Sequence, residues 1–311
     1  MKNKIKKINY NHSFIFFIFC NFFSLVIFKT INSIISPLIC LFLILSIGVS
    51  HGSLDHLKGK KLFKIYSIEN ISYFYLIYIF IATTIILLWM MFPTFSLIVF
   101  LIVASFHFGK EDTQFLISKK SYFNDFLFFL KGSLIVWAPI YFNFNETISI
   151  FKLLFIENEN FYKSLEFFET NNILLIGLIL STLSSIIFFI KEFKTKKFII
   201  FFDYFSIIIL NNYFSPLIAF TIYFCFLHSI RHSIMLSSEL NSNDLLKGFN
   251  IFFKKAIPLT LITATFCLIC LYLLNNNYNF DSSILKVIFI GLASLTFPHI
   301  LLEYLIEKNE K

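Results

Sequence analysis

Apolar segments close to the thickness of a membrane recur along the whole chain, and they limit its fold more than any other feature. A helix needs about 20 apolar residues to cross the hydrocarbon core of a bilayer. Candidate spans lie at 13–29, 31–51, 71–92, 94–109, 125–143, 172–190, 198–213, 215–235, 256–275 and 284–304. They lack the alternating polar residues of membrane barrel strands, so they favour helices. The sequence therefore predicts an all-α, polytopic transmembrane helical bundle with about ten spans.

Composition leaves little room for a separate soluble domain. The chain is 58% hydrophobic and 14% charged, whereas a soluble domain is about 25% charged. We therefore expect residues 1–311 to form a single integral membrane domain. The net charge of +8 would also suit a nucleic-acid-binding protein, but the lysines are dispersed between the apolar runs. The sequence thus predicts contact with membrane lipid and no nucleic acid partner.

The basic residues are distributed unevenly between the two sides of the predicted membrane. With the N-terminus placed in the cytoplasm, the inner segments hold 20 of the 26 lysines and arginines and the outer segments hold three. Cytoplasmic loops of membrane proteins carry such an excess of Lys and Arg. We therefore expect a multi-pass protein of the cell membrane with both termini cytoplasmic. The longest loop, about 144–171, is acidic and is expected outside.

Histidines gather at one level of this predicted bundle. Six of the seven lie in or at the end of spans, namely His51, His56, His107, His228, His232 and His299. Each of the four spans that carry them runs from the outside to the inside. The sequence therefore places all six near the cytoplasmic face at similar depth.

The spacing and type of these residues point to a metal. Ionisable residues within spans are costly and usually face the interior of the bundle. His228 and His232 are four residues apart, so they share one helix face, and this spacing suits two ligands of one metal ion. Imidazole ligands favour iron, copper, zinc or nickel over magnesium. A shared metal site between helices is therefore favoured over unrelated packing histidines.

Two carboxylates follow a histidine at the same helical spacing. Asp55 lies four residues after His51, and Glu303 lies four residues after His299. Metal-bound histidines commonly donate their second ring N–H to a carboxylate, which fixes the ring. We therefore expect Asp55 and Glu303 to support the metal-binding histidines.

The roles of three further charged residues stay open at this stage. Glu111 and Asp112 follow Lys110, so they are either partners of the site or ordinary polar residues at a helix end. Arg231 lies between two histidines but points about 60° away from His228 and about 100° away from His232 around the helix. It either extends to the inner headgroups or pairs with a carboxylate.

Four motifs together resemble a known family. "HGSLDH", "FHFGKED", "HSIRH" and "FPHILLE", in this order over about residues 45–305, are similar to the Brp/Blh family of bacterial and archaeal β-carotene 15,15′-dioxygenases. The resemblance implies a polytopic membrane oxidoreductase that uses O₂ to cleave β-carotene at its central double bond into two molecules of all-trans retinal, which supply microbial rhodopsins. It implies an Fe(2+) cofactor bound by four matching histidines, His51, His107, His228 and His232.

The resemblance leaves other positions without a ligand role. His56 and His299 are typical of the family but are not assigned to the iron, and no catalytic residue is expected beyond the metal centre. The first 40 or so residues carry little of the resemblance.

Two other functions fit part of the same pattern. A membrane di-iron desaturase or hydroxylase has histidine boxes with the spacings of "HSIRH" and "HGSLDH", but such enzymes use more histidines, including adjacent pairs that this chain lacks. A metal-ion transporter would favour ligands at several depths along a path. The single predicted layer of histidines suits a fixed site better.

Overall fold

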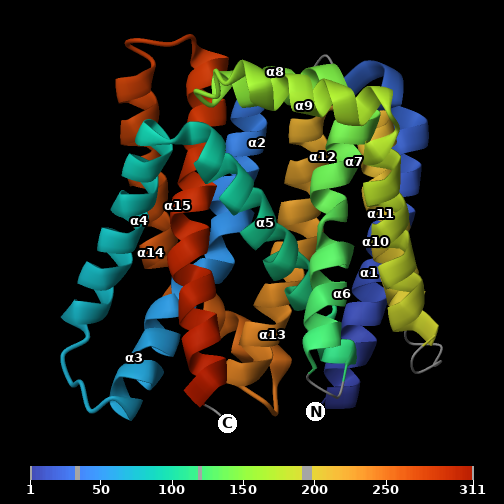
Figure 1. Ribbon diagram of the computed structural model, residues 1–311. Helices are drawn as coiled ribbons and strands as arrows, with labels where there is room; N and C mark the ends of the chain where they lie inside the picture. Colours follow the sequence, from blue (N-terminus) through green and yellow to red (C-terminus); the bar gives the residue numbers. More distant parts are fainter. Residues whose placement is uncertain (1, 32–35, 118–120, 191–197, 310–311) are drawn as a thin grey trace.

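The computed structural model describes residues 2–31, 36–117, 121–190 and 198–309, without the side chains of residues 2–4, 27–31 and 51. Every regular element in these ranges is a helix (Figure 1). The helices are α1 (Lys2–Ile31), α2 (Pro37–Leu43), η1 (Ile44–Gly48), η2 (Val49–Leu54), α3 (Asp55–Ile65), α4 (Ser72–Met91), α5 (Pro93–Glu111), η3 (Gln114–Leu116), α6 (Tyr122–Gly132), α7 (Leu134–Phe142), α8 (Phe144–Leu153), α9 (Glu159–Thr170), α10 (Ile173–Ile190), α11 (Ile199–Tyr213), α12 (Pro216–Ile222), η5 (Tyr223–Ser229), α13 (Ile230–Leu240), α14 (Leu245–Leu274) and α15 (Phe280–Asn309).

Local sequence signals set several helix starts. Helices α2, α5 and α12 begin at Pro37, Pro93 and Pro216. Proline suits the first helical position because its missing N–H has no intrahelical partner there. Asp244 caps α14, since its side chain accepts hydrogen bonds from the backbone N–H groups of Leu246 and Lys247.

Eight helical stretches of the described chain are long and apolar enough to cross a membrane. They are Pro37–Ile65, Ser72–Met91, Pro93–Leu116, Tyr122–Phe142, Ile173–Ile190, Pro216–Leu240, Leu245–Leu274 and Phe280–Asn309. The predicted polytopic helical bundle is therefore confirmed. The predicted span at 198–213 corresponds to α11, which has 15 residues, and the one at 13–29 lies within α1. The total of ten spans stays a prediction.

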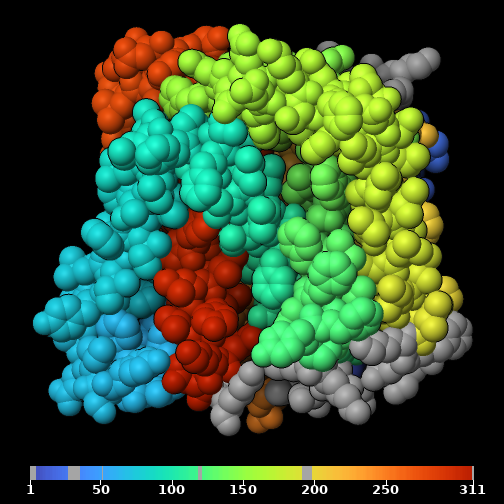
Figure 2. All heavy atoms as spheres, viewed as in Figure 1, coloured from blue at the N-terminus to red at the C-terminus, as the bar shows by residue number. Residues whose placement is uncertain are grey.

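The two ends of the bundle differ. Both termini lie at one end, and α8 and α9 lie across the other (Figure 1). These two helices occupy most of the segment that the sequence predicted as a long loop. In Figure 2 the C-terminal half of α15, in red, reaches the surface between α4 and α6. Its Leu301 is 43% exposed and its Tyr304 is 59% exposed, as expected of side chains that face lipid.

Two glycines let α5 and α6 touch backbone to backbone. A Cβ atom on Gly109 would overlap the carbonyl oxygen of Phe128, and one on Gly132 would overlap the carbonyl oxygen of Ser105. Small residues allow this close approach in membrane bundles, where helices gain stability from packing rather than from the hydrophobic effect. The crossing fixes the last turn of α5, which carries His107.

Candidate metal centre

Two of the predicted histidines lie on one long helix with an irregular middle. The run from α12 through η5 to α13 is unbroken over residues 216–240, and η5 is a π-helical segment that contains His228. A second π-helical segment, η1, directly precedes η2, where His51 lies. The two segments are in contact, and Ser229 Oγ donates to the carbonyl of Gly48 at 3.2 Å. π-Helical turns occur frequently at functional sites.

Four histidine rings from three parts of the chain form a buried cluster. The centroid of the His107 ring on α5 lies 5.5 Å from that of His228 and 5.3 Å from that of His299 on α15. The centroids of His232 and His299 are 5.9 Å apart. All four side chains are buried. The bundle therefore brings His107, His228 and His232 together, as the sequence predicted, and adds His299.

Three of these rings contact a carboxylate through the same nitrogen, Nδ1. His228 Nδ1 lies 3.2 Å from Asp112, and His232 Nδ1 lies 3.2 Å from Glu111. His299 Nδ1 lies 2.9 Å from both carboxylate oxygens of Asp55. An ionised carboxylate only accepts hydrogen bonds, so each Nδ1 carries the proton and donates it. The Nε2 of His228 and of His232 is then left with the lone pair that binds a metal.

The Glu303 carboxylate lies beside two of the clustered histidines. Its carboxylate oxygens are 3.6 Å from His299 Nε2 and 3.9 Å from His107 Nδ1, and Lys58 Nζ lies 2.8 Å from it. Two sets of ligand atoms, each within 4.8 Å of one another, include this carboxylate. The sets are His107 with His299 and Glu303, and Glu111 with His232 and Glu303.

The charges of the cluster suit a cation. Asp55, Glu111 and Asp112 are buried, and the Glu303 side chain is 14% exposed. Buried carboxylates are costly unless they are paired or coordinate a metal. Lys58 forms a short ion pair with Glu303, which leaves the group with excess negative charge. A divalent cation would balance that charge, and the donor set of imidazoles and carboxylates fits a transition metal.

Three other residues that the sequence singled out, His51, His56 and Asp55, are placed as follows. His51 lies on η2, but its side chain is outside the described residues. His56 Nδ1 lies 3.0 Å from the carbonyl of Ser53, one turn earlier in the chain. Asp55 contacts His299, and its expected pairing with His51 stays a prediction because the His51 side chain is outside the described residues.

Several contributors to the site were not found, or were left open, by the sequence. Of the two alternatives for Glu111 and Asp112, partnership with the site holds, since each contacts a histidine. Tyr78 supports the site from α4 by donating to Asp55 at 3.0 Å. Lys58 was missed because it is one of several lysines in its segment. Asp203 on α11 accepts hydrogen bonds from Arg231 and was also missed. Like Arg231, it is a charged residue within an apolar run, so the same signal could have found it.

Comparison with known proteins shows the family to which this chain belongs. The model of the β-carotene 15,15′-dioxygenase family matches residues 42–307. The chain belongs to that family. It is 29% identical over 274 residues to a β-carotene 15,15′-dioxygenase from uncultured marine bacterium 66A03, an alignment that covers 84% of this chain and 90% of the relative. No solved structure matches it. The resemblance predicted from the four motifs is confirmed, and the chain is assigned to a family of carotene-cleaving enzymes.

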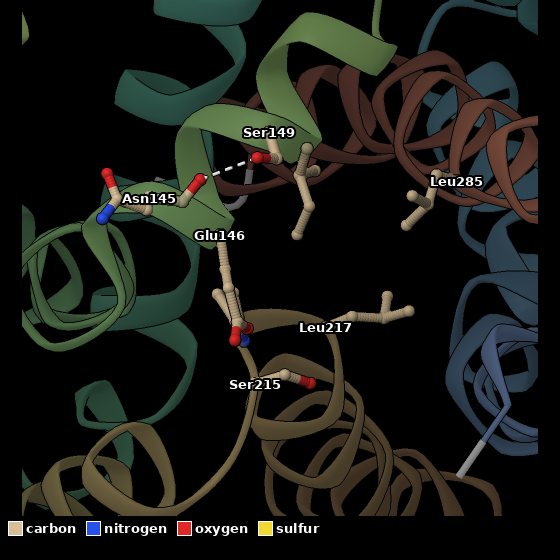
Figure 3. A pocket seen from close by; sticks show the side chains of 8 residues that line it. Asn145, Glu146, Ser149, Ser215, Leu217 and Leu285 are labelled. Atoms are coloured by element: carbon tan, nitrogen blue, oxygen red, sulfur yellow. Dashed lines mark hydrogen bonds between the residues drawn. The ribbon is translucent and has the colours of Figure 1, made fainter. Parts of the chain in front are cut away.

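A surface pocket of this dioxygenase-family protein lies away from the histidines. It has a volume of about 360 Å³ and lies between α8 and the first turns of α12 and α15 (Figure 3). Leu217 and Leu285 line it. Leu285 precedes His299 by 14 residues on the same helix, which corresponds to about 21 Å. The pocket is therefore at the opposite end of the bundle from the cluster.

Proposed function

We propose that this protein is an iron-dependent dioxygenase that cleaves β-carotene at its 15,15′ double bond. The observation that carries the proposal is the buried cluster of four histidines, three of them held by carboxylates, inside a membrane bundle of the β-carotene 15,15′-dioxygenase family. The products would be two molecules of all-trans retinal, which would supply a microbial rhodopsin.

The proposed iron ligands are the four histidines that match the family motifs. His107, His228 and His232 come from the cluster, and His51 is the fourth. When bound, Fe(II) would supply open coordination positions and electrons for the reaction with O₂. His299 and Glu303 also present ligand atoms at this centre, so they would complete the shell or hold a ligand in place.

The side chains around the iron ligands would prepare the site in two ways. Asp112 and Glu111 hold the Nδ1 protons of His228 and His232, which keeps each Nε2 available to the metal. The Phe108 ring meets the His228 ring edge-to-face at 4.7 Å, and the Phe224 ring stacks on it at 5.9 Å. These buried rings would keep water away from the imidazole of His228.

The substrate chemistry agrees with a membrane location. β-Carotene is a hydrocarbon that dissolves in the bilayer, and α15, which carries His299, reaches the lipid-facing surface (Figure 2). The carotene would therefore reach the site from the membrane without crossing water. Cleavage breaks the central C=C bond and the O–O bond and forms two C=O bonds. Both oxygen atoms enter the products, so no external reductant is needed.

A di-iron enzyme is a second candidate because of one observation. The two sets of ligand atoms share Glu303, and a carboxylate that bridges two metals would offset the shortage of histidines for a two-iron site. The number of metal ions per chain separates the candidates. One iron supports the dioxygenase, and two irons would favour a desaturase or hydroxylase.

Purified protein in detergent, given Fe(II), β-carotene and air, should form retinal without NADPH, flavin or ferredoxin. We expect two molecules of retinal for each O₂ consumed, measured by chromatography and an oxygen electrode. A requirement for a reductant, or a product that keeps the full carbon skeleton with new hydroxyl groups or double bonds, would favour the di-iron candidate instead.

The basic residues also lead us to propose an orientation in the cell membrane. Both termini lie at one end of the bundle, and the lysine distribution places that end in the cytoplasm. Reporter domains inserted near residues 60 and 245 should therefore be cytoplasmic, and one near residue 155 should be external. Export of the reporter near residue 60 would contradict this orientation.

A further inference from the structure

The single arginine of the chain is fully inside the bundle. Arg231 on α13 is 1% exposed, so it does not extend to the headgroups, and of its two expected roles the pairing with a carboxylate holds. Its Nη1 donates to Asp203 Oδ2 at 2.9 Å and its Nη2 donates to Asp203 Oδ1 at 3.0 Å. This two-pronged geometry is specific to a guanidinium and fixes the plane of the group.

The same guanidinium holds the end of α5 that carries a site carboxylate. Arg231 Nη1 donates to the carbonyl oxygen of Asp112 at 3.1 Å and lies 3.5 Å from its carboxylate. That carboxylate accepts hydrogen bonds from Tyr223 at 2.6 Å and from His228 Nδ1 at 3.2 Å. The backbone and the side chain of Asp112 are therefore both fixed, and with them the ring of a proposed iron ligand.

The N-terminal helix takes part in this network. Ser13 on α1 accepts a hydrogen bond from Arg231 Nη2 at 2.5 Å. One residue earlier, His12 Nε2 lies 2.8 Å from the carbonyl oxygen of Phe226, which belongs to the π-helical segment η5. Helix α1 packs along α11, the helix of Asp203 (Figure 1). It also lies outside residues 42–307, the part that the family model matches.

We propose that α1 and α11 position the metal site through Ser13, Asp203 and Arg231. Asp203 and Ser13 hold the guanidinium in one plane, the guanidinium fixes Asp112, and Asp112 orients the His228 ring. His12 adds a second contact from α1 to the helix that carries His228. The proposal rests on the proposed function in one respect, since it requires a metal at His228. Ser13, Asp203 and Arg231 are positioning residues that do not touch the metal.

A role in metal positioning differs measurably from a role in stability alone. Co(II) bound by the full-length protein reports ligand geometry through its visible absorption bands. Arg231→Lys keeps the positive charge but loses the planar fork, so Co(II) affinity should fall about tenfold and the bands should shift. Ser13→Ala should shift both in the same direction by less. The double variant should lose less than the two single changes combined, because both act through one group.

A buried hydrogen bond far from the cluster provides the control. Trp89 is fully buried and donates to the carbonyl oxygen of Leu154 at 3.1 Å. Trp89→Phe removes that bond and should leave the Co(II) affinity and bands unchanged. Circular dichroism of the helices and elution from a sizing column establish which variants are folded. If Arg231→Lys does not fold, the Co(II) affinity and bands of Ser13→Ala test the positioning role.

Two failures can be told apart. A folded Ser13→Ala protein whose Co(II) affinity and bands equal those of Trp89→Phe would overturn the positioning role. A wild-type protein that binds no Co(II) or Fe(II) would instead overturn the metal centre itself, and the positioning role with it.

Discussion

Replacing His232 with alanine should nearly abolish iron binding and carotene cleavage together. His232 lies within the buried cluster, and Glu111 holds its Nδ1 at 3.2 Å, so its Nε2 is expected to bind the metal. Loss of this imidazole removes one ligand and leaves a cavity inside the bundle. Alanine at His107 or His228 should have the same effect. Iron content of the purified protein, measured by elemental analysis, and retinal formation are the two readouts.

Added imidazole separates the loss of a ligand from the loss of the fold. A free imidazole molecule fits the cavity left by His232→Ala and offers the same nitrogen, so it should restore part of the iron binding. Benzene, a small apolar ring, should fill the cavity without restoring iron because it has no nitrogen to bind the metal. Full iron occupancy of His232→Ala without imidazole would contradict the assignment of this ligand.

Removing the carboxylate of Asp55 should weaken iron binding by roughly 10–100-fold, the range seen when a hydrogen-bond partner in the shell around a metal site is lost. Asp55 holds His299 Nδ1 through both oxygens at 2.9 Å. Asp55→Ala frees that ring to rotate away from the cluster. An iron titration of the purified variant measures the change in affinity.

Tyr78→Phe is the matched control for this prediction. Tyr78 donates to Asp55 at 3.0 Å and to the carbonyl of Leu295 at 3.3 Å. The variant removes only the hydroxyl and keeps the carboxylate beside His299, so its iron affinity should stay much closer to that of the wild type. Equal affinities for Asp55→Ala and the wild type would show that His299 does not act at the metal.

Local spacing in the sequence was enough to predict part of the cluster. His228 and His232 are one helical turn apart, so any continuous helix places them on one face. The distribution of lysines placed four histidine-bearing spans in the same direction, which put His107 and His299 at a similar depth. Depth and face are properties of a single helix, and they follow from length and period.

The partners of the histidines could not be predicted in the same way. Asp55 and His299 are 244 residues apart, and Arg231 and Asp203 are 28 residues apart. These contacts depend on how each helix is rotated about its axis and on which helices are neighbours. Packing of α15 against α3 places Asp55 beside His299, a contact that the spacing of Asp55 from His51 did not indicate.

Some helix ends and irregular turns also could not be predicted from the sequence. The segment 144–171 was expected to be a loop, but it forms α8 and α9, which lie across the end of the bundle (Figure 1). Asn158 caps α9 by accepting a hydrogen bond from the backbone N–H of Phe161, and this short polar signal is hard to tell from a loop. The π-helical segment η5 could not be predicted from apolar periodicity. It is a short change of hydrogen bonding within a continuous helix, and the apolar residues on either side follow the usual helical pattern.

The most direct test of the proposed function is chromatography of extracts from β-carotene-producing bacteria that carry the wild-type protein or His232→Ala. The wild type should bleach the yellow-orange colour and yield all-trans retinal, and the variant should leave β-carotene intact. Unchanged β-carotene with the wild-type protein present in the membrane and loaded with iron would contradict the proposed activity.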